Sequence, residues 1–117
     1  FDGICILFPR KMAHTIVLMT NRKGKQMVNS WKQYANTKEA FDGICHNFEE
    51  KLKADHPGVK NLTYDISDLF NFIDDCPDIV CMVLDNETHT YIPRDKKWIK
   101  TNIFRHLKRQ VEEEKNN

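Results

Sequence analysis

The sequence predicts a single α+β domain in which three amphipathic helices cover one face of a four-stranded antiparallel sheet, in the order β-β-α-α-β-β-α. Two observations lead to this prediction. Apolar residues recur every three or four positions in three segments that begin at helix-capping residues, and short apolar runs of strand length accompany these segments. A chain of 117 residues, 40% of them apolar, is sufficient for one hydrophobic core.

The first two elements are expected to form a β-hairpin. Residues 14–20 (HTIVLMT) are a run of strand length that is rich in β-branched and aliphatic side chains. Residues 21–25 are polar and contain Gly24, which favours a turn. Residues 27–32 would then form the second strand, although their pattern is less regular.

The first helix is expected to begin after Asn36, which can cap it together with Glu39. One apolar stripe follows at helical spacing: Phe41, Ile44, Cys45, Phe48 and Leu52. Residues 56–58 (HPG) end the helix because proline cannot continue its hydrogen bonds. Gly43 lies inside the helix, where glycine costs about 1 kcal/mol relative to alanine, so we expect another backbone to pass close to it.

The second half of the chain is expected to form two further helices around a second hairpin. Asp65 caps the first of these helices, and Pro77 ends that region. Its apolar face contains Ile66, Leu69, Phe70 and Ile73. Residues 79–84 and 88–92 form the hairpin, and Asp95 caps the last helix. The expected core positions of that helix are Ile99, Ile103, Leu107 and Val111, flanked by Trp98 and Phe104.

The longest strand candidates lack the apolar–polar alternation that is typical of a sheet with one solvated face. The helices can cover only one of the two apolar faces. In so short a chain the simplest cover for the other face is a second copy of the sheet, so we predict a homodimer. His14, Ile16 and Leu18 share one face of the first strand. We assign that face to the interface, because His14 under the helices would be buried with few polar partners.

The net charge of +1 argues against a general nucleic-acid binder. The charged residues are nevertheless unevenly distributed along the chain. Residues 61–93 contain seven acidic residues and no Lys or Arg, whereas residues 94–109 contain seven basic residues and one acidic residue. This division favours electrostatic complementarity with a partner or a second subunit. Two ordinary solvated faces are an equally good interpretation.

The sequence contains no pattern that predicts catalysis, a cofactor or a metal site. It lacks a glycine-rich phosphate loop, a nucleophile elbow and an H-E-x-x-H motif, and Asp74 and Asp75 are interpreted as a solvated turn. Cys45 and Cys81 lie in apolar runs and are expected to be buried free thiols. We therefore predict neither an enzyme nor a small-molecule substrate. The lack of a membrane-spanning apolar run and of a signal peptide leads us to expect an intracellular protein without membrane contact.

Two pairs of side chains are candidates for protein contacts. Trp31 and Tyr34 could form an aromatic anchor for a peptide, or could pack at the end of their strand. His89 and Tyr91 share one face of the last predicted strand, and we interpret them as an interface pair rather than a binding site. Direct RNA binding through residues 94–109 is the alternative function. It ranks second because the two longest strands offer no aromatic residues on which bases could stack.

Residues 63–75 (TYDISDLFNFIDD) closely resemble the signature segment of the enhancer of rudimentary family. Three further motifs resemble this family in the same order: HTI at residues 14–16, TYIP at residues 90–93 and DKKWIK at residues 95–100. The resemblance extends from about Met12 to Val111. This chain departs from the family around its partner-contacting region, where residues 31–34 (WKQY) replace a Tyr-x-x-Tyr pair and residues 21–26 lack the usual prolines.

The resemblance implies a non-enzymatic adaptor of the nucleus and cytoplasm that dimerises through its sheet. Family members bind short peptide segments of RNA-processing proteins, so RNA would be reached only through partners. Divergent members act in small-RNA pathways of the piRNA type, and we carry this expectation over to the present chain. We assign the dimer interface to His14, Ile16, Leu18, His89 and Tyr91. We assign partner binding to Trp31, Tyr34, Arg94 and Lys97.

The pentapeptide FDGIC occurs at residues 1–5 and again at residues 41–45, inside the predicted first helix. Family members carry a similar MEGVC segment at the second location, so that copy belongs to the domain. We place the domain at residues 12–111 and a flexible polar tail at residues 112–117. Residues 1–11 would lie outside it, as an artificial addition or an upstream extension. Because residues 4–11 (ICILFPRK) are apolar and then basic, an imitation of a partner peptide is a further hypothesis.

Overall fold

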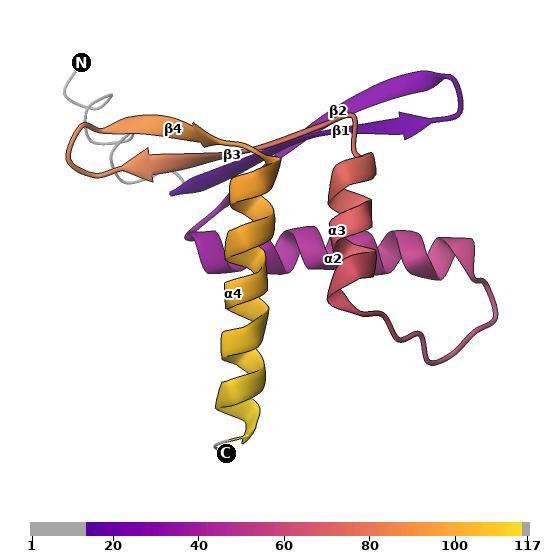
Figure 1. Cartoon of the computed structure of the whole chain (residues 1–117). Coiled ribbons are helices and arrows are strands. Elements are labelled where there is room, and N and C mark those ends of the chain that lie inside the picture. The colour runs from indigo at the N-terminus through magenta and orange to yellow at the C-terminus, as the bar shows by residue number, and fades with distance from the viewer. Residues whose placement is uncertain (1–13, 116–117) are drawn as a thin grey trace.

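A computed structural model of the chain describes residues 14–115, and its elements follow the predicted order (Figure 1). The elements are β1 (Thr15–Lys23), β2 (Gln26–Tyr34), α2 (Thr37–Asp55), α3 (Ile66–Asp75), β3 (Asp78–Asp85), β4 (Thr90–Arg94) and α4 (Lys96–Lys115). The last helix thus extends through residues 112–115 of the predicted tail. The predictions about residues 1–13, including the extension and its FDGIC copy, concern residues outside the described part of the chain.

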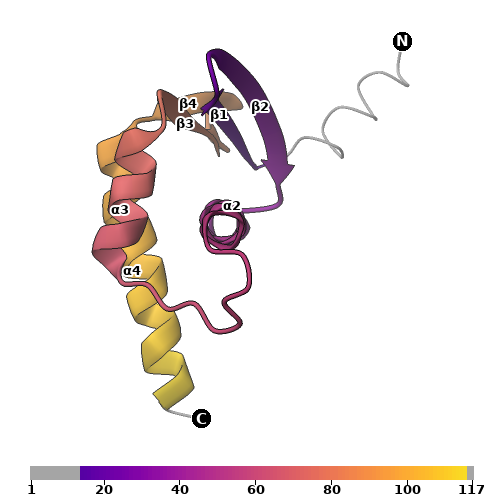
Figure 2. The same cartoon turned by 90° about the vertical axis from the view of Figure 1, so that its right-hand side faces the viewer.

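The four strands form one antiparallel sheet in the order β2-β1-β3-β4. Figures 1 and 2 show α2, α3 and α4 on the same side of this sheet, with α2 crossing beneath the strands and α3 beside α4. The other face of the sheet carries no helix in the part of the chain that the structure describes. The predicted α+β class and the one-sided arrangement of the helices are therefore confirmed.

The strands differ from the prediction mainly at their ends. The first hairpin is longer than expected, because its turn consists only of Gly24 and Lys25 and pairing continues from Lys23 and Gln26 back to Tyr34. Gly24 has a φ of 63°, the left-handed conformation that glycine adopts without strain. In the second hairpin β4 begins only at Thr90. The prediction that residues 88 and 89 belong to this strand is wrong.

The three predicted helix caps are present. The Asn36 side chain accepts a hydrogen bond from the backbone N–H of Glu39 at 2.9 Å. The Asp65 carboxylate accepts from the N–H of Asp68 at 3.1 Å, and the Asp68 carboxylate in turn accepts from the N–H of Asp65 at 3.1 Å. Asp95 accepts from the N–H of Trp98 at 2.9 Å. Each cap satisfies a helical N–H that would otherwise lack a partner, and so fixes where its helix begins.

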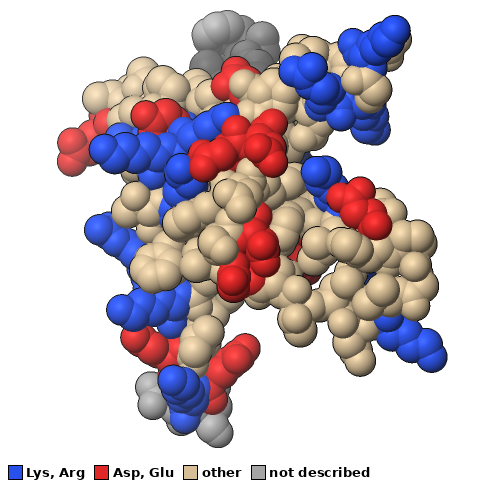
Figure 3. All heavy atoms as spheres, turned by 45° about the vertical axis from the view of Figure 1, so that its right-hand side comes forward, with Lys and Arg blue, Asp and Glu red and all other residues tan. Residues whose placement is uncertain are grey.

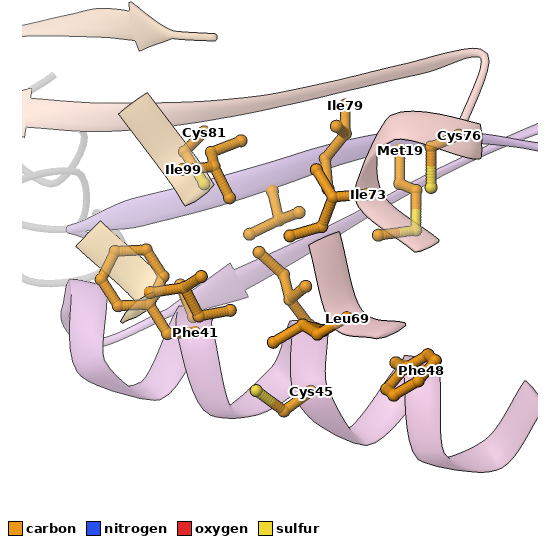
Figure 4. Close-up of a cluster of buried hydrophobic side chains, with 14 residues drawn as sticks. Met19, Phe41, Cys45, Phe48, Leu69, Ile73, Cys76, Ile79, Cys81 and Ile99 are labelled. Carbon is orange, nitrogen blue, oxygen red and sulfur yellow. The ribbon is translucent and has the colours of Figure 1, made fainter. Parts of the chain in front are cut away.

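The core lies between the sheet and the helices (Figure 4). Val17 and Met19 of β1 point into it, as predicted for the face opposite Leu18. The helices contribute fully buried side chains at Ile44, Leu69, Ile73, Ile99 and Ile103. The free thiols of Cys45 and Cys81 are buried in the same cluster, which confirms that prediction.

Two predictions are corrected: the burial of Val111 in α4, and the kind of neighbour that Gly43 has in α2. Val111 is 51% exposed rather than buried, because the lower end of α4 extends past α2 (Figures 1 and 2). His106, which we did not assign to the core, is only 7% exposed and lies 2.8 Å from Asp42. The close neighbour of Gly43 is the side chain of Tyr34, not another backbone.

No helix among residues 14–115 has the length and apolar character needed to cross a bilayer.

Candidate functional site

The first candidate surface is the face of the sheet that points away from the helices, here called the open face. Ile16 and Leu18 of β1 stand opposite Met82 and Val80 of β3, and Leu18 also stands opposite Trp31 of β2. Residues paired in this way share a face of the sheet. Leu18 is 42% exposed and Trp31 is 65% exposed. The open face therefore presents apolar side chains where a solvated sheet would present polar ones.

Most of the predicted interface residues lie on or beside this face. Ile16 and Leu18 lie within it, and Tyr91 joins it because it pairs with Leu84, two residues after Met82. The carbonyl of His14 accepts a hydrogen bond from the N–H of Leu84 at 2.8 Å, so His14 extends the strand by one residue. His89 is instead in the turn before β4, with a φ of 57°. The assignment of these residues to a dimer interface stays a prediction.

Trp31 and Tyr34 do not form one aromatic anchor. Residues three apart in a strand point to opposite faces, and both residues belong to β2. Trp31 lies on the open face, whereas Tyr34 packs on Gly43 of α2 beneath the sheet. Burial raises the pKa of the Tyr34 hydroxyl. Tyr34 therefore joins the sheet to the first helix. This agrees with the alternative interpretation, in which the residue packs at the end of its strand.

Arg94 is the last residue of β4 and Lys97 lies in the first turn of α4, and their environments differ. The guanidinium carbon of Arg94 is 5.5 Å from the centre of the Trp98 ring, a distance at which a cation–π interaction stabilises both groups. The Nε atom of Arg94 is buried without a hydrogen-bond partner. Lys97 is exposed and lines a groove between the last two helices.

This second candidate surface, here called the α3/α4 groove, is formed where α3 lies beside α4 (Figure 2). It consists of an upper hollow of about 640 Å³, which reaches Lys97 near the start of α4, and a lower hollow of about 560 Å³, which reaches Lys115 at its end. The two hollows share Ile66, Phe104 and Lys108. Its apolar lining includes Ile66, Leu69, Phe70, Phe104, Leu107 and Val111. Phe104 is 45% exposed, so a large aromatic ring faces solvent in the middle of the groove.

The walls of the α3/α4 groove are basic. The lining includes Lys97, Lys100, Arg105, Lys108 and Lys115. Figure 3 shows Lys and Arg side chains down the left side of the molecule, with acidic side chains among them towards the lower end. Sequence reasoning identified the basic segment but missed the groove, in part because it placed the exposed Val111 in the core. Leu107 does pack against the core and also lines the groove.

Part of the predicted charge division is satisfied within the chain. Lys100 forms an ion pair with Asp74 at 2.8 Å. The ammonium group of Lys96 donates to the carbonyl oxygens of Cys76 and Asp74, at 2.6 and 3.0 Å. Among residues 14–115, Lys97, Arg105, Lys108 and Lys115 form no ion pair. These four groups remain available to an acidic partner.

The described cysteines have the properties of structural thiols. Burial raises the pKa of both Cys45 and Cys81 to about 12, and burial also raises the pKa of Cys76. A protonated, buried thiol is a poor nucleophile and a poor metal ligand. Within the described part of the chain, no three His, Cys, Asp or Glu side chains are grouped as metal ligands.

The fold and these surfaces define a class of protein: a single α+β domain with a sheet covered on one face and an apolar, exposed second face. The sequence model of the enhancer of rudimentary family matches residues 11–113. This chain belongs to that family, so the resemblance seen in the sequence is confirmed.

Individual relatives agree with this assignment. The chain is 43% identical over 98 residues to an enhancer of rudimentary homolog of Dictyostelium discoideum, covering 84% of this chain and 97% of that protein. It is 45% identical over 94 residues to a homolog of Caenorhabditis elegans, covering 80% and 90%. It is 42% identical over 96 residues to a homolog of Arabidopsis thaliana, covering 82% and 87%. These names refer to the family and not to a reaction.

Proposed function

We propose that this chain is a non-enzymatic, homodimeric adaptor that binds short peptide segments of RNA-processing proteins and holds them together. The observation that carries the proposal is the apolar open face, on which Leu18 and Trp31 are exposed beside Ile16 and Val80. A contiguous apolar surface of this kind is typical of a protein–protein interface. The role in RNA metabolism is proposed from what the family resemblance implies, for a chain that belongs to this family.

The open face suits pairing with a second copy of itself. It is formed by all four strands, so two sheets could pack face to face with their side chains interdigitated. In a two-fold dimer each copy contributes the same surface, and an apolar surface is complementary to itself. The helices would then lie on the two outer sides of the dimer, where each copy can bind one partner segment.

Dimerisation would give a non-enzymatic adaptor its mechanism. Two identical sites on one rigid particle raise the effective concentration of the second binding event, so weak segments are held more tightly together than alone. We place this adaptor in the nucleus and cytoplasm, and in a small-RNA pathway of the piRNA type, on the basis of the family resemblance. RNA would be reached through the bound proteins.

Direct RNA binding is the second candidate function. It is favoured by the basic side chains of α4 that form no ion pair among residues 14–115, including Lys97, Arg105, Lys108 and Lys115. Phosphate contacts release counterions, so RNA affinity would then fall steeply with salt concentration. The apolar open face has no role in this alternative.

Affinity purification tests the adaptor proposal. The tagged chain is purified from cells with and without RNase, and the retained proteins are identified by mass spectrometry. We expect a defined set of partners that survives RNase. Leu18→Arg should reduce this set because it disrupts the dimer, whereas Val59→Arg, which places the same charge on an exposed loop, should leave it unchanged. Loss of all partners with RNase would contradict the proposal and favour direct RNA binding.

A further inference from the structure

The geometry points to the α3/α4 groove as the binding site for an acidic amphipathic helix of a partner protein. This inference rests on the adaptor function proposed above. It adds the location of the site and the chemistry of the segment that occupies it. The site lies on the helical side of the domain, away from the open face of the sheet.

The shape of the groove fits a helix. α3 leads up to β3 and α4 leads down from β4, so the two helices run side by side in opposite directions (Figures 1 and 2). A third helix can lie in the groove between two such helices and bury its apolar stripe there. α3 has 10 residues, which corresponds to a length of about 15 Å, so both walls are present along roughly three turns of a bound helix.

The apolar lining supplies the contacts for anchoring side chains. Ile66 and Phe70 of α3 are one helical turn apart and face Phe104 of α4 across the upper hollow. Phe104 also lines the lower hollow, together with Leu107 and Val111. A partner with apolar residues at positions i, i+4 and i+7 would cover the exposed Phe104 ring and the exposed Val111.

The charges around the groove select an acidic partner. The upper hollow is lined by Lys97, Lys100, Arg105 and Lys108, with no acidic residue among its lining. The lower hollow contains Asp65 and Glu112, but the Asp65 carboxylate already accepts hydrogen bonds from Ser67 and from the start of α3. Lys100 is already paired with Asp74. Acidic side chains that flank the anchors would therefore meet Lys97, Arg105 and Lys108, which form no ion pair among residues 14–115, in the upper hollow, and a smaller net attraction in the lower one.

A protein segment fits this surface better than RNA does. Bases need aromatic platforms and hydrogen-bonding groups, whereas the lower hollow is lined largely by the aliphatic side chains of Ile66, Leu69, Leu107 and Val111. The Phe70 ring is moreover covered by the Lys100 ammonium group, 5.9 Å from its centre. Aliphatic anchors lose nothing on such a surface, whereas base edges would lose hydrogen bonds to water.

Fluorescence anisotropy with the full chain tests the proposal. The probe is a labelled synthetic peptide of about 16 residues, with Leu and Phe at positions i, i+4 and i+7 and Glu or Asp elsewhere. A scrambled peptide of the same composition lacks this spacing. We expect the patterned peptide to bind about tenfold more tightly than the scrambled one, and its affinity to fall with salt.

Substitutions locate the binding site. Arg105→Glu combined with Lys108→Glu should weaken binding of the patterned peptide about tenfold or more, and Phe104→Ala should do the same without changing charge. All three residues are exposed, and helix content measured by circular dichroism confirms folding. The matched control, Lys23→Glu combined with Lys25→Glu, makes the same charge change at the first hairpin turn and should alter affinity less than about twofold.

Three outcomes would overturn the proposal. The first is equal affinity for the patterned and the scrambled peptide. The second is that the groove variants bind the patterned peptide as tightly as the unmodified chain does. The third is that the chain binds an oligouridine RNA tightly but not the peptide, and that the groove variants lose this RNA binding. The affinity purification separates this proposal from the adaptor function. If RNase-resistant partners stay bound to the Arg105→Glu, Lys108→Glu variant, only the groove assignment fails. If the unmodified chain retains none, the adaptor function itself fails.

Discussion

Tyr34 and Gly43 fit against each other where the sheet meets the first helix. The hydroxyl end of the Tyr34 side chain occupies the space in which any other residue at position 43 would place its β-carbon. The other two nearest atoms to that position, Cζ and Cε1 at 2.6 and 2.8 Å, belong to the same ring. A glycine that weakens α2 locally is therefore required by the packing of β2 on that helix.

This contact predicts an unusual effect of an alanine substitution. Gly43→Ala should lower the free energy of unfolding by about 1–3 kcal/mol, because steric overlap with Tyr34 outweighs the gain of about 1 kcal/mol in helix propensity. Urea denaturation measures the change. In a Tyr34→Ala background the same substitution should become neutral or stabilising. An equal cost in both backgrounds would show that the ring is not the cause.

His106 and Asp42 form the main polar link between α4 and α2. The His106 ring is almost fully buried, and its Nε2 lies 2.8 Å from a carboxylate oxygen of Asp42. Asp42→Ala should lower the free energy of unfolding by about 1–2 kcal/mol, since a buried polar group loses its partner. Asp42→Asn, which keeps an oxygen acceptor, should cost less. Asp55→Ala on the same helix is the control, and an equal effect there would refute the link.

The described cysteines should not react in the folded protein. With the pKa values of Cys45 and Cys81 raised to about 12 by burial, roughly one thiol in ten thousand is ionised at about pH 8. A thiol reagent added to a Cys5→Ser variant should label Cys45, Cys76 and Cys81 only after urea unfolds the chain. Stoichiometric labelling before unfolding would contradict the buried positions.

The Asp65 cap should make stability depend on pH. Its pKa is lowered chiefly because the Ser67 hydroxyl donates to the carboxylate, with a further contribution from the N–H of Asp68. A lowered folded-state pKa means that the ionised group contributes stability above its unfolded pKa, and that this is lost as pH falls through the folded value. The cost of Asp65→Ala in urea denaturation should therefore be larger at about pH 7 than at about pH 3. A cost independent of pH would exclude the ionised cap.

Helix positions could be predicted from the sequence because their signals are local. Asn36, Asp65 and Asp95 each lie three residues before a bonded N–H, so caps and apolar spacing were visible together. The strand ends could not be predicted in the same way. β2 is exposed along nearly its whole length, so its sequence shows no two-residue alternation that would mark Tyr34 as part of the strand. Without this alternation, the sequence does not show that Trp31 and Tyr34 lie on opposite faces, so it allows them to be interpreted as one aromatic anchor.

The α3/α4 groove depends on contacts between distant segments. Its two walls are formed by residues near positions 66 and 104, and nothing in either helix alone shows that they meet. A signal was nevertheless present in α4. Phe104 and Lys108 are one helical turn apart and lie beside Lys97 and Thr101 on the same helical face, opposite the buried Ile99 and Ile103. An aromatic residue on a basic face indicates a contact surface rather than a core.

Sedimentation equilibrium tests the central claim most directly. The account predicts that the unmodified chain has twice the mass of one chain. Leu18→Arg should reduce this to the mass of a monomer, because it places a charge in the centre of the apolar open face. Val59→Arg, at a similarly exposed apolar residue outside the sheet, should remain dimeric. A monomeric unmodified chain, or a dimer that Leu18→Arg leaves intact, would contradict the account.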